Sequence, residues 1–135
     1  RRSPHTMAST PFGLEKTYVH LTADGGATPI PVTPDFWASI ATRYDLDEGF
    51  LVTRMPMTED WPHWEMHPEG EEVVILLSGA VDLLLDGGTR QWTVELRPET
   101  NTWINPRGVW HRGLVREPSE LMFITAGRGT QHRAA

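Results

Sequence analysis

Turn-forming residues interrupt this chain so often that no apolar stretch grows beyond the length of a β-strand. The 135 residues include 11 prolines and 12 glycines, spread along the chain rather than pooled. The longest uninterrupted apolar run, Val73–Leu77, is only strand-length. Short apolar runs with turn residues between them are typical of all-β proteins, and a chain of this length suits a single domain.

Charge and composition exclude several classes of function. Acidic residues outnumber basic ones by 18 to 12, and the formal net charge is −6. A nucleic-acid-binding surface needs clustered Lys and Arg, so no nucleic-acid partner is expected. No apolar run approaches the roughly 20 residues of a transmembrane helix, so no membrane association is expected and a cytoplasmic location is the default. Because the chain has no cysteine, any metal must be held by His, Asp and Glu.

Composition along the chain predicts an N-terminal segment, an extension, a barrel and a tail. Their expected bounds are 1–7, 8–47, 48–127 and 128–135. The first segment is expected to be a cloning remnant or disordered, because Met7 would be a natural start, and the tail is expected to fray. Thr33-Pro34-Asp35 combines a capping hydroxyl, a first-turn proline and an acid, which predicts a short helix over 34–43.

Strand signals dominate the remainder of the chain. One strand is expected at 16–21 within an otherwise irregular stretch, and about eight follow, at 49–55, 61–67, 72–77, 80–85, 90–96, 102–105, 113–116 and 120–126. Ser78-Gly79 is expected to form a tight turn and Asp86-Gly87-Gly88 a hairpin, because Asp-Gly and Gly-Gly tolerate positive φ. Many short strands with turns between them predict a barrel or jelly roll.

The segment from Trp61 to Glu72 carries the most chemistry. On a strand, alternate side chains share a face, so His63, Glu65 and His67 are expected to point one way and Trp64 and Met66 the other. One face of each strand in a barrel lines the interior. Burying a carboxylate without compensation is costly, and a divalent ion between these side chains would remove that cost.

Two more candidate ligands lie on other strands. Glu72 follows His67 after a Pro-Glu-Gly turn, so a hairpin can return it alongside His67. His111 is the first ligand-type residue after the turn formed by Pro106 and Gly108. It is distant from His67 in sequence, so only the fold could bring the two imidazoles together.

These two segments resemble the two motifs of the cupin superfamily, in its small single-domain form with an RmlC-like jelly roll. The first family motif reads Gly, five residues, His-x-His, three or four residues, Glu, six residues, Gly. The second reads Gly, five residues, Pro-x-Gly-x-x-His, three residues, Asn. The residues that match are His67, Glu72, Gly79, Pro106, Gly108 and His111. The resemblance covers roughly residues 48–127 and implies an all-β, double-stranded β-helix or jelly-roll barrel, here with one short N-terminal helix.

The resemblance also implies a set of metal ligands. In the family these are both His of His-x-His, the Glu and the second-motif His, which correspond here to Glu65, His67, Glu72 and His111. The first His is thus replaced by Glu65, and Glu59, Thr100 and Val115 stand at other family positions. The expected cofactor is one divalent ion, Fe, Mn, Zn or Ni, and a carboxylate ligand favours a harder or more oxidised ion.

Several residues near these ligands have more than one interpretation. Glu65 is interpreted as a metal ligand, a partner of a ligating imidazole, or a proton-moving catalytic residue. His63 is interpreted as a substrate contact, a catalytic proton carrier, a surface residue or a further ligand. Trp61 and Trp103 are candidates for lining a substrate pocket, and the alternative for both is core packing.

The leading functional hypothesis is a metal-dependent enzyme, of the oxygenase, isomerase or lyase class, acting on a small organic molecule that is carboxylate- or sugar-like. The alternative is a non-catalytic small-molecule-binding or sensory cupin with a degenerate metal site. Many small cupins form homodimers that pair through sheet edges. The resemblance therefore implies a homodimer, with residues 14–21 covering an edge.

Overall fold

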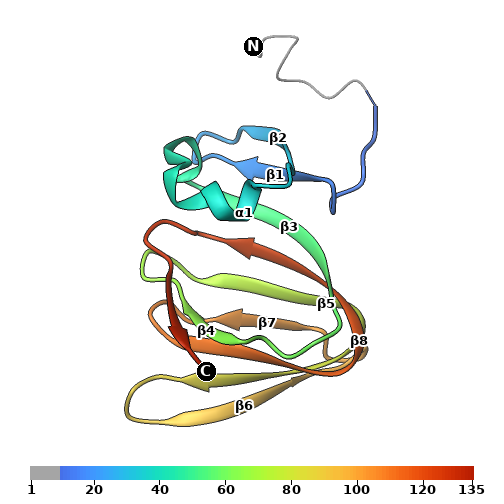
Figure 1. Ribbon diagram of the computed structural model, residues 1–135, viewed down its shortest axis with the longest axis vertical. Coiled ribbons are helices and arrows are strands. Elements are labelled where there is room, and N and C mark those ends of the chain that lie inside the picture. Colours follow the sequence, from blue (N-terminus) through green and yellow to red (C-terminus); the bar gives the residue numbers. More distant parts are fainter. Residues whose placement is uncertain (1–9) are drawn as a thin grey trace.

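The computed structural model describes residues 10–135, which form a β-barrel with a small N-terminal layer on one end (Figure 1). The described residues form nine strands: β1 (Thr17–Leu21), β2 (Ala27–Pro31), β3 (Phe50–Met57), β4 (His63–Met66), β5 (Glu72–Asp86), β6 (Gln91–Leu96), β7 (Thr102–Asn105), β8 (Trp110–Thr125) and β9 (Gln131–Ala134). The predicted all-β class is confirmed. The prediction for residues 1–7 lies outside the described residues.

Two long antiparallel strands, β5 and β8, organise the barrel. They pair from Glu72 opposite Thr125 to Asp86 opposite Trp110. On one side the sheet continues in the order β2-β1-β3-β8-β4-β9, while β5 also pairs with β6 and β7. Each long strand bends and contributes to both halves of the barrel. The two ends of β5 therefore belong to different halves (Figure 1).

The bend in β5 replaces the predicted turn at Ser78-Gly79, which was wrong. The strand continues through these residues, and the register with β8 shifts between Leu76 and Val81, as in a β-bulge. Gly79 has a φ of 94°, and a Cβ there would lie 2.2 Å from Ser119 Oγ. Some bulges and some tight turns both favour a glycine at positive φ, so the local sequence does not separate them. The predicted break in β8 between 116 and 120 was also wrong, because β8 continues through these residues opposite the bulge.

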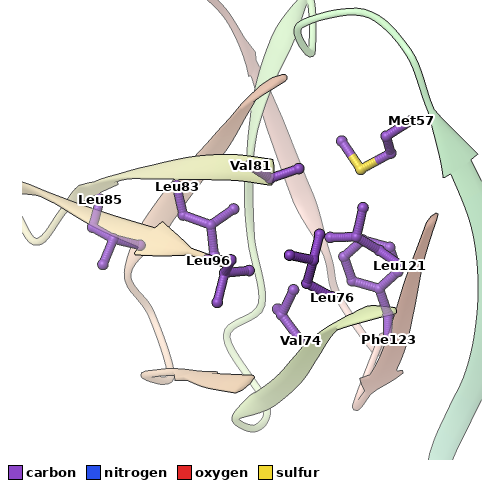
Figure 2. Close-up of a cluster of buried hydrophobic side chains, with 9 residues drawn as sticks. All are labelled: Met57, Val74, Leu76, Val81, Leu83, Leu85, Leu96, Leu121 and Phe123. Atoms are coloured by element: carbon purple, nitrogen blue, oxygen red, sulfur yellow. The ribbon is translucent and has the colours of Figure 1, made fainter. Parts of the chain in front are cut away.

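The main core fills the barrel interior (Figure 2). Val81, Leu83 and Leu85 are fully buried, which agrees with their expected shared face on one side of β5. The other members are Met57, Val74, Leu76, Leu96, Leu121 and Phe123. Each side chain of this size contributes about 1.5–3 kcal/mol when fully buried. The hairpin at Asp86-Gly87-Gly88 leads into β6 as predicted, and Gly88 has a φ of 93°.

The N-terminal layer consists of the β1–β2 hairpin and α1 (Phe36–Ser39), followed by 3₁₀ turns at 40–42 and 44–46. The predicted helix over 34–43 was therefore too long. The Thr33 hydroxyl donates to Asp35 Oδ1 at 2.6 Å, and no side chain caps α1. The structure also forms β2 within the N-terminal stretch that was expected to be irregular. β1 pairs with β2 and with β3 of the same chain, so it already covers an edge.

The end of the chain forms β9 and does not fray as predicted. β9 pairs with β4 along its length, from His63 opposite Ala134 to Met66 opposite Gln131. Figure 1 shows this last strand lying along the side of the barrel next to β4. In residues 10–135 no helix has the length and apolar content needed to cross a membrane.

Candidate metal centre

β4 and the residue that follows it present three potential ligands on one side. His63, Glu65 and His67 alternate along the chain, so they share a face. Oε1 of Glu65 lies 3.7 Å from His67 Nε2, and Oε2 lies 3.7 Å from His63 Nε2. Each carboxylate oxygen of Glu65 therefore faces a different imidazole.

His111 reaches the same cluster from β8. It is paired directly with Glu65, and its Nε2 lies 3.7 Å from Glu65 Oε1. The turn before it is tied to the first motif, because the Gly108 N–H donates to the carbonyl of His67 at 3.0 Å. Gly108 has a φ of 76°, a conformation that favours glycine. The two distant motif segments are thus joined by backbone as well as by side chains.

Glu72, the first residue of β5, lies between the two buried histidines. Its Oε2 is 3.3 Å from His67 Nε2, and its Oε1 is 3.3 Å from His111 Nε2. Metal–ligand bonds of about 2.0–2.2 Å place two ligand atoms of one ion about 3–3.5 Å apart. Each oxygen of Glu72 therefore lies at the spacing of two ligands to a shared ion from one of the two buried histidine nitrogens.

The two nitrogens that face Glu72 have no hydrogen bond. Nε2 of His67 and Nε2 of His111 are both buried and lack a hydrogen-bond partner. A buried polar atom without a partner costs about 1–3 kcal/mol. A divalent ion would take both lone pairs and balance the charge of the neighbouring carboxylates. The residues of this cluster therefore fit such an ion.

The hydrogen bond on the far side of His67 sets its tautomer. The Thr130 hydroxyl donates to the carbonyl of Gly127 at 2.8 Å, so its oxygen is free to accept from His67 Nδ1, which is 2.8 Å away. A proton on Nδ1 leaves the Nε2 lone pair directed at Glu65 and Glu72. Ligating histidines are commonly oriented by such a contact on the other ring nitrogen.

Glu72 is oriented in a similar way by two neighbouring strands. Thr125, its partner on β8, donates to Oε2 at 2.5 Å, and Asn105, its partner on β7, donates to Oε1 at 3.3 Å. Asn105 is in turn fixed by Trp103, whose Nε1 donates to Asn105 Oδ1 at 3.0 Å. The carboxylate is therefore held in place by a chain of polar contacts that starts at the edge strand β7.

The histidines control the charge state of both carboxylates. Burial raises the pKa of Glu72, but His111 and His67 outweigh it and hold that pKa far below its ordinary value. Burial also raises the pKa of Glu65, and the same imidazoles bring it below the usual range. Burial lowers the pKa of His111, whereas Glu65 and Glu72 together raise it to about 9. Both carboxylates are thus ionised at neutral pH, which is the form that binds cations, whereas His111 is protonated there and releases its proton when it ligates an ion.

Several solved structures have a fold similar to that of this chain. An oxalate decarboxylase from Lactobacillus farciminis aligns with 63% of this chain and 26% of its own, at 11% identity and a TM-score of 0.52. An oxalate oxidase aligns with 60% of this chain and 44% of its own, at 15% identity and a TM-score of 0.50. These structures are cupins. The chain has a cupin fold. No protein-family profile and no curated protein sequence matches it.

Similarity at these identities concerns the cupin fold alone. Peruvianin-I, a cysteine peptidase from the latex of Thevetia peruviana, matches with a TM-score of 0.52 at 14% identity, over 64% of this chain and 56% of its own. The chain spans between 26% and 56% of the length of these three structures. Because similar folds occur in proteins of such different description, function here has to be argued from the site.

His132 is a residue of this cluster that the sequence analysis missed. It lies on β9 directly opposite Glu65, and its Nε2 is 3.2 Å from Glu65 Oε2. Its ring also contacts the ring of His63, with centroids 4.9 Å apart. The only signal for it was a ligand-type residue near the end of the chain, in a segment without apolar periodicity.

The remaining candidates lie at different distances from the ligands. The Trp61 ring packs 5.8 Å from that of His111, and its Nε1 donates to Met57 Sδ at 3.3 Å. Trp61 therefore forms a wall beside one buried histidine. Trp103 reaches the cluster only through Asn105, as described above, and packs against the apolar core.

Proposed function

We propose that this cupin binds one divalent metal ion through Glu65, His67, Glu72 and His111, and that the site serves an enzyme acting on a small organic molecule. The observation that carries the proposal is the pair of buried imidazole nitrogens, on His67 and His111, that face Glu72 without a hydrogen bond. Fe, Mn, Zn and Ni all accept imidazole and carboxylate ligands, so each is a candidate.

The balance of charge supports this choice of ligands. Glu65 and Glu72 carry two negative charges between them when ionised, and a divalent ion would neutralise both. When bound, the ion would supply Lewis-acid or oxygen-activating chemistry, as in oxygenases, isomerases and lyases. Glu72 is buried among its polar contacts, so we assign it to ligation alone.

Glu65 and His63 are the proposed proton-handling groups. The side chain of Glu65 is 26% exposed and that of His63 is 40% exposed, whereas His67 and His111 are buried. Oε2 of Glu65 faces His63 at 3.7 Å on the solvent side of the cluster. Whichever of Glu65 and His63 is not coordinated could take a proton from a substrate and release it to water, a role that requires groups near the surface.

Metal analysis of tag-free protein, purified without chelator, tests the proposal. We expect about one tightly held equivalent at the inner site after reloading with Fe, Mn, Zn or Ni, and loss of that equivalent in His67→Ala and in His111→Ala. His5→Ala, which removes a histidine that precedes the described residues, is the matched control. Less than about a tenth of an equivalent in the reloaded wild-type protein would end the proposal.

Glu65 stands where the family motif has its first histidine. This replacement favours a second candidate function, that of a non-catalytic sensory or binding cupin. A thermal-shift screen of carboxylates and sugars, run on metal-loaded and metal-stripped protein, separates the two functions. Ligands that stabilise both forms equally would support the binding module. Ligands that stabilise only the loaded form would support the metal-dependent enzyme, because a ligand that needs the ion shifts unfolding only when the ion is present.

We also propose that this cupin forms a homodimer. Trp37 and Tyr44 of the N-terminal layer are 50% and 75% exposed. Exposed aromatic side chains are features that partner chains cover. Sedimentation at micromolar concentration should show a dimer, and a monomer there would rule it out.

A further inference from the structure

Glu65 lies at the centre of a cross of four imidazoles. Along β4 its neighbours on the same face are His63 and His67, and across the sheet they are His111 on β8 and His132 on β9. Its Oε1 faces the buried pair at 3.7 Å each. Its Oε2 faces the outer pair, at 3.7 Å from His63 Nε2 and 3.2 Å from His132 Nε2.

The outer pair has the composition of a metal site in its own right. Donor atoms of His63, Glu65 and His132 lie within 4.8 Å of one another, as do those of Glu65, His67 and His111. Two imidazoles and a carboxylate suit zinc-like ions. The side chains of His63 and His132 are 40% and 55% exposed, so water could fill the remaining coordination positions.

We propose that His63, Glu65 and His132 form a second divalent-metal site on the solvent side of the inner one, with Glu65 bridging the two ions. Carboxylate-bridged pairs of ions lie about 3.5–4 Å apart in proteins, a distance that one carboxylate can span. The proposal shares Glu65 with the inner site of the proposed function and depends on that site only through this residue.

The strand that carries His132 is firmly anchored. Arg133 lies between two indole rings, 4.6 Å from the Trp110 centroid and 5.1 Å from that of Trp64, and its Nη2 donates to Asp86 Oδ2 at 2.6 Å. Because Arg133 and His132 are adjacent on a strand, they point to opposite faces, and the anchor on one face fixes the ligand on the other. The outer site is thus preorganised rather than left to a mobile terminus.

A second site also explains why a carboxylate occupies this position. An imidazole ligand uses one nitrogen for one ion, whereas the two oxygens of a carboxylate can each bind a different ion. The negative charge of Glu65 would be shared by two cations, and the two cations repel each other. We therefore expect the outer ion to bind more weakly than the inner one, because only one of its three ligands is charged.

Equilibrium dialysis of chelator-stripped, tag-free protein against Zn²⁺ alone tests the proposal by stoichiometry. We expect two equivalents in the wild type, one in His132→Ala and in His63→Ala, and two in the control His5→Ala. His111→Ala should keep one equivalent, held by the outer site. Glu65→Gln should weaken both equivalents, since it removes the shared charge. Far-UV circular dichroism of the stripped variants confirms that each retains the fold.

The outcomes separate the outer site from the inner one. A single wild-type equivalent that persists in His132→Ala and is lost in His111→Ala overturns the second site and leaves the proposed function standing. A single equivalent lost in His132→Ala but kept in His111→Ala overturns the inner site instead. Two wild-type equivalents that both survive in His132→Ala and in His63→Ala would place the second ion elsewhere and also overturn the proposal.

Discussion

Glu65 and His132 lie directly opposite each other on β4 and β9, with Glu65 Oε2 3.2 Å from His132 Nε2. On its other side Glu65 is paired with His111 of β8. The last strand of the chain and one of the two long barrel strands therefore meet at a single carboxylate. Substitution at Glu65 should disturb both clusters, whereas substitution of His111 or His132 should disturb one.

The contact between Thr130 and His67 predicts an effect on metal affinity without loss of a ligand. Thr130→Val keeps the shape of the side chain but removes the oxygen that accepts from His67 Nδ1. Without it the ring is free to adopt the other tautomer or orientation. We expect Zn²⁺ affinity of the inner site to fall about 10–100-fold, the range typical of such outer contacts.

Competition with a chromophoric chelator measures this affinity. The matched control is Thr102→Val, because Thr102 is exposed and its hydroxyl contacts only the neighbouring Asn101 among the described hydrogen bonds. An unchanged affinity in Thr130→Val would show that packing alone sets the orientation of His67.

The bulge in β5 predicts a large difference between two glycines with nearly the same φ. At Gly79, with φ of 94°, an added Cβ would lie 2.2 Å from Ser119 Oγ and 2.5 Å from the carbonyl of Pro118. At Gly88, with φ of 93°, it would meet nothing within 4 Å. Gly88→Ala should therefore cost only the conformational term of about 1–2 kcal/mol.

Gly79→Ala adds a collision with backbone to that term. We expect its free energy of unfolding to fall by about 3 kcal/mol or more, measured by urea denaturation. Equal losses in the two variants would mean that the two long strands separate easily at the bulge.

The ion pairs of Asp82 predict that the stability of the protein depends on pH through a group that lies outside the metal cluster. It is buried, and its carboxylate contacts Arg116 Nε at 2.8 Å and Arg97 Nη2 at 3.0 Å. Burial raises the pKa of Asp82, but the two guanidinium groups outweigh it and lower that pKa. A carboxyl whose pKa is lower in the folded state contributes stability above its unfolded value of about 3.9, and that contribution is lost as the pH falls through the folded pKa.

Thermal or urea unfolding between neutral pH and the acid range tests this dependence. Asp82→Asn should lose about 1–2 kcal/mol at neutral pH, and the difference from the wild type should shrink as the pH drops below about 4. Glu59→Gln removes one exposed carboxylate and serves as the charge control. A difference between wild type and Asp82→Asn that stays constant with pH would contradict the role of the ionised group.

The sequence predicted the barrel better than its ends. The strand at Thr102–Asn105 has the predicted bounds, and the alternation of Val81, Leu83 and Leu85 identified the core face of β5, because burial imposes a period of two. The motif spacing led to His67, Glu72 and His111, and the structure places the carboxylate of Glu72 3.3 Å from each of the two imidazoles. Local periodicity and motif spacing thus suffice where burial repeats along the chain.

Features that depend on distant partners were not predictable in this way. Gln131–Ala134 is exposed along its whole length, so no apolar alternation marks it as a strand. Its place depends on backbone pairing with β4 and on the contacts of Arg133 with residues far away in sequence. Thr125 and Asn105 were missed for a similar reason, because they meet Glu72 only through strand register.

The contacts of Arg133 predict that this residue controls the outer cluster, although it is not one of the ligands. Arg133→Ala removes the ion pair with Asp86 and the stacking on Trp64 and Trp110, and it leaves Asp86 with fewer donors. We expect the amides of 131–134 to exchange at least about 10-fold faster with deuterium, and the overall stability to fall by about 1–2 kcal/mol. Arg133→Lys retains the charge but not the planar stacking, so it should give a smaller effect of the same sign.

Hydrogen-exchange mass spectrometry of the C-terminal peptide measures the loosening, and Zn²⁺ stoichiometry measured on the same samples shows its consequence. If His132 acts as a ligand positioned by β9, the second equivalent should weaken in Arg133→Ala, and the first should weaken less, since β9 does not supply the inner ligands. Exchange in 131–134 that remains as slow as in the wild type would mean that backbone pairing with β4 holds the strand without the arginine. In that case His132 would keep its place opposite Glu65 whatever residue follows it.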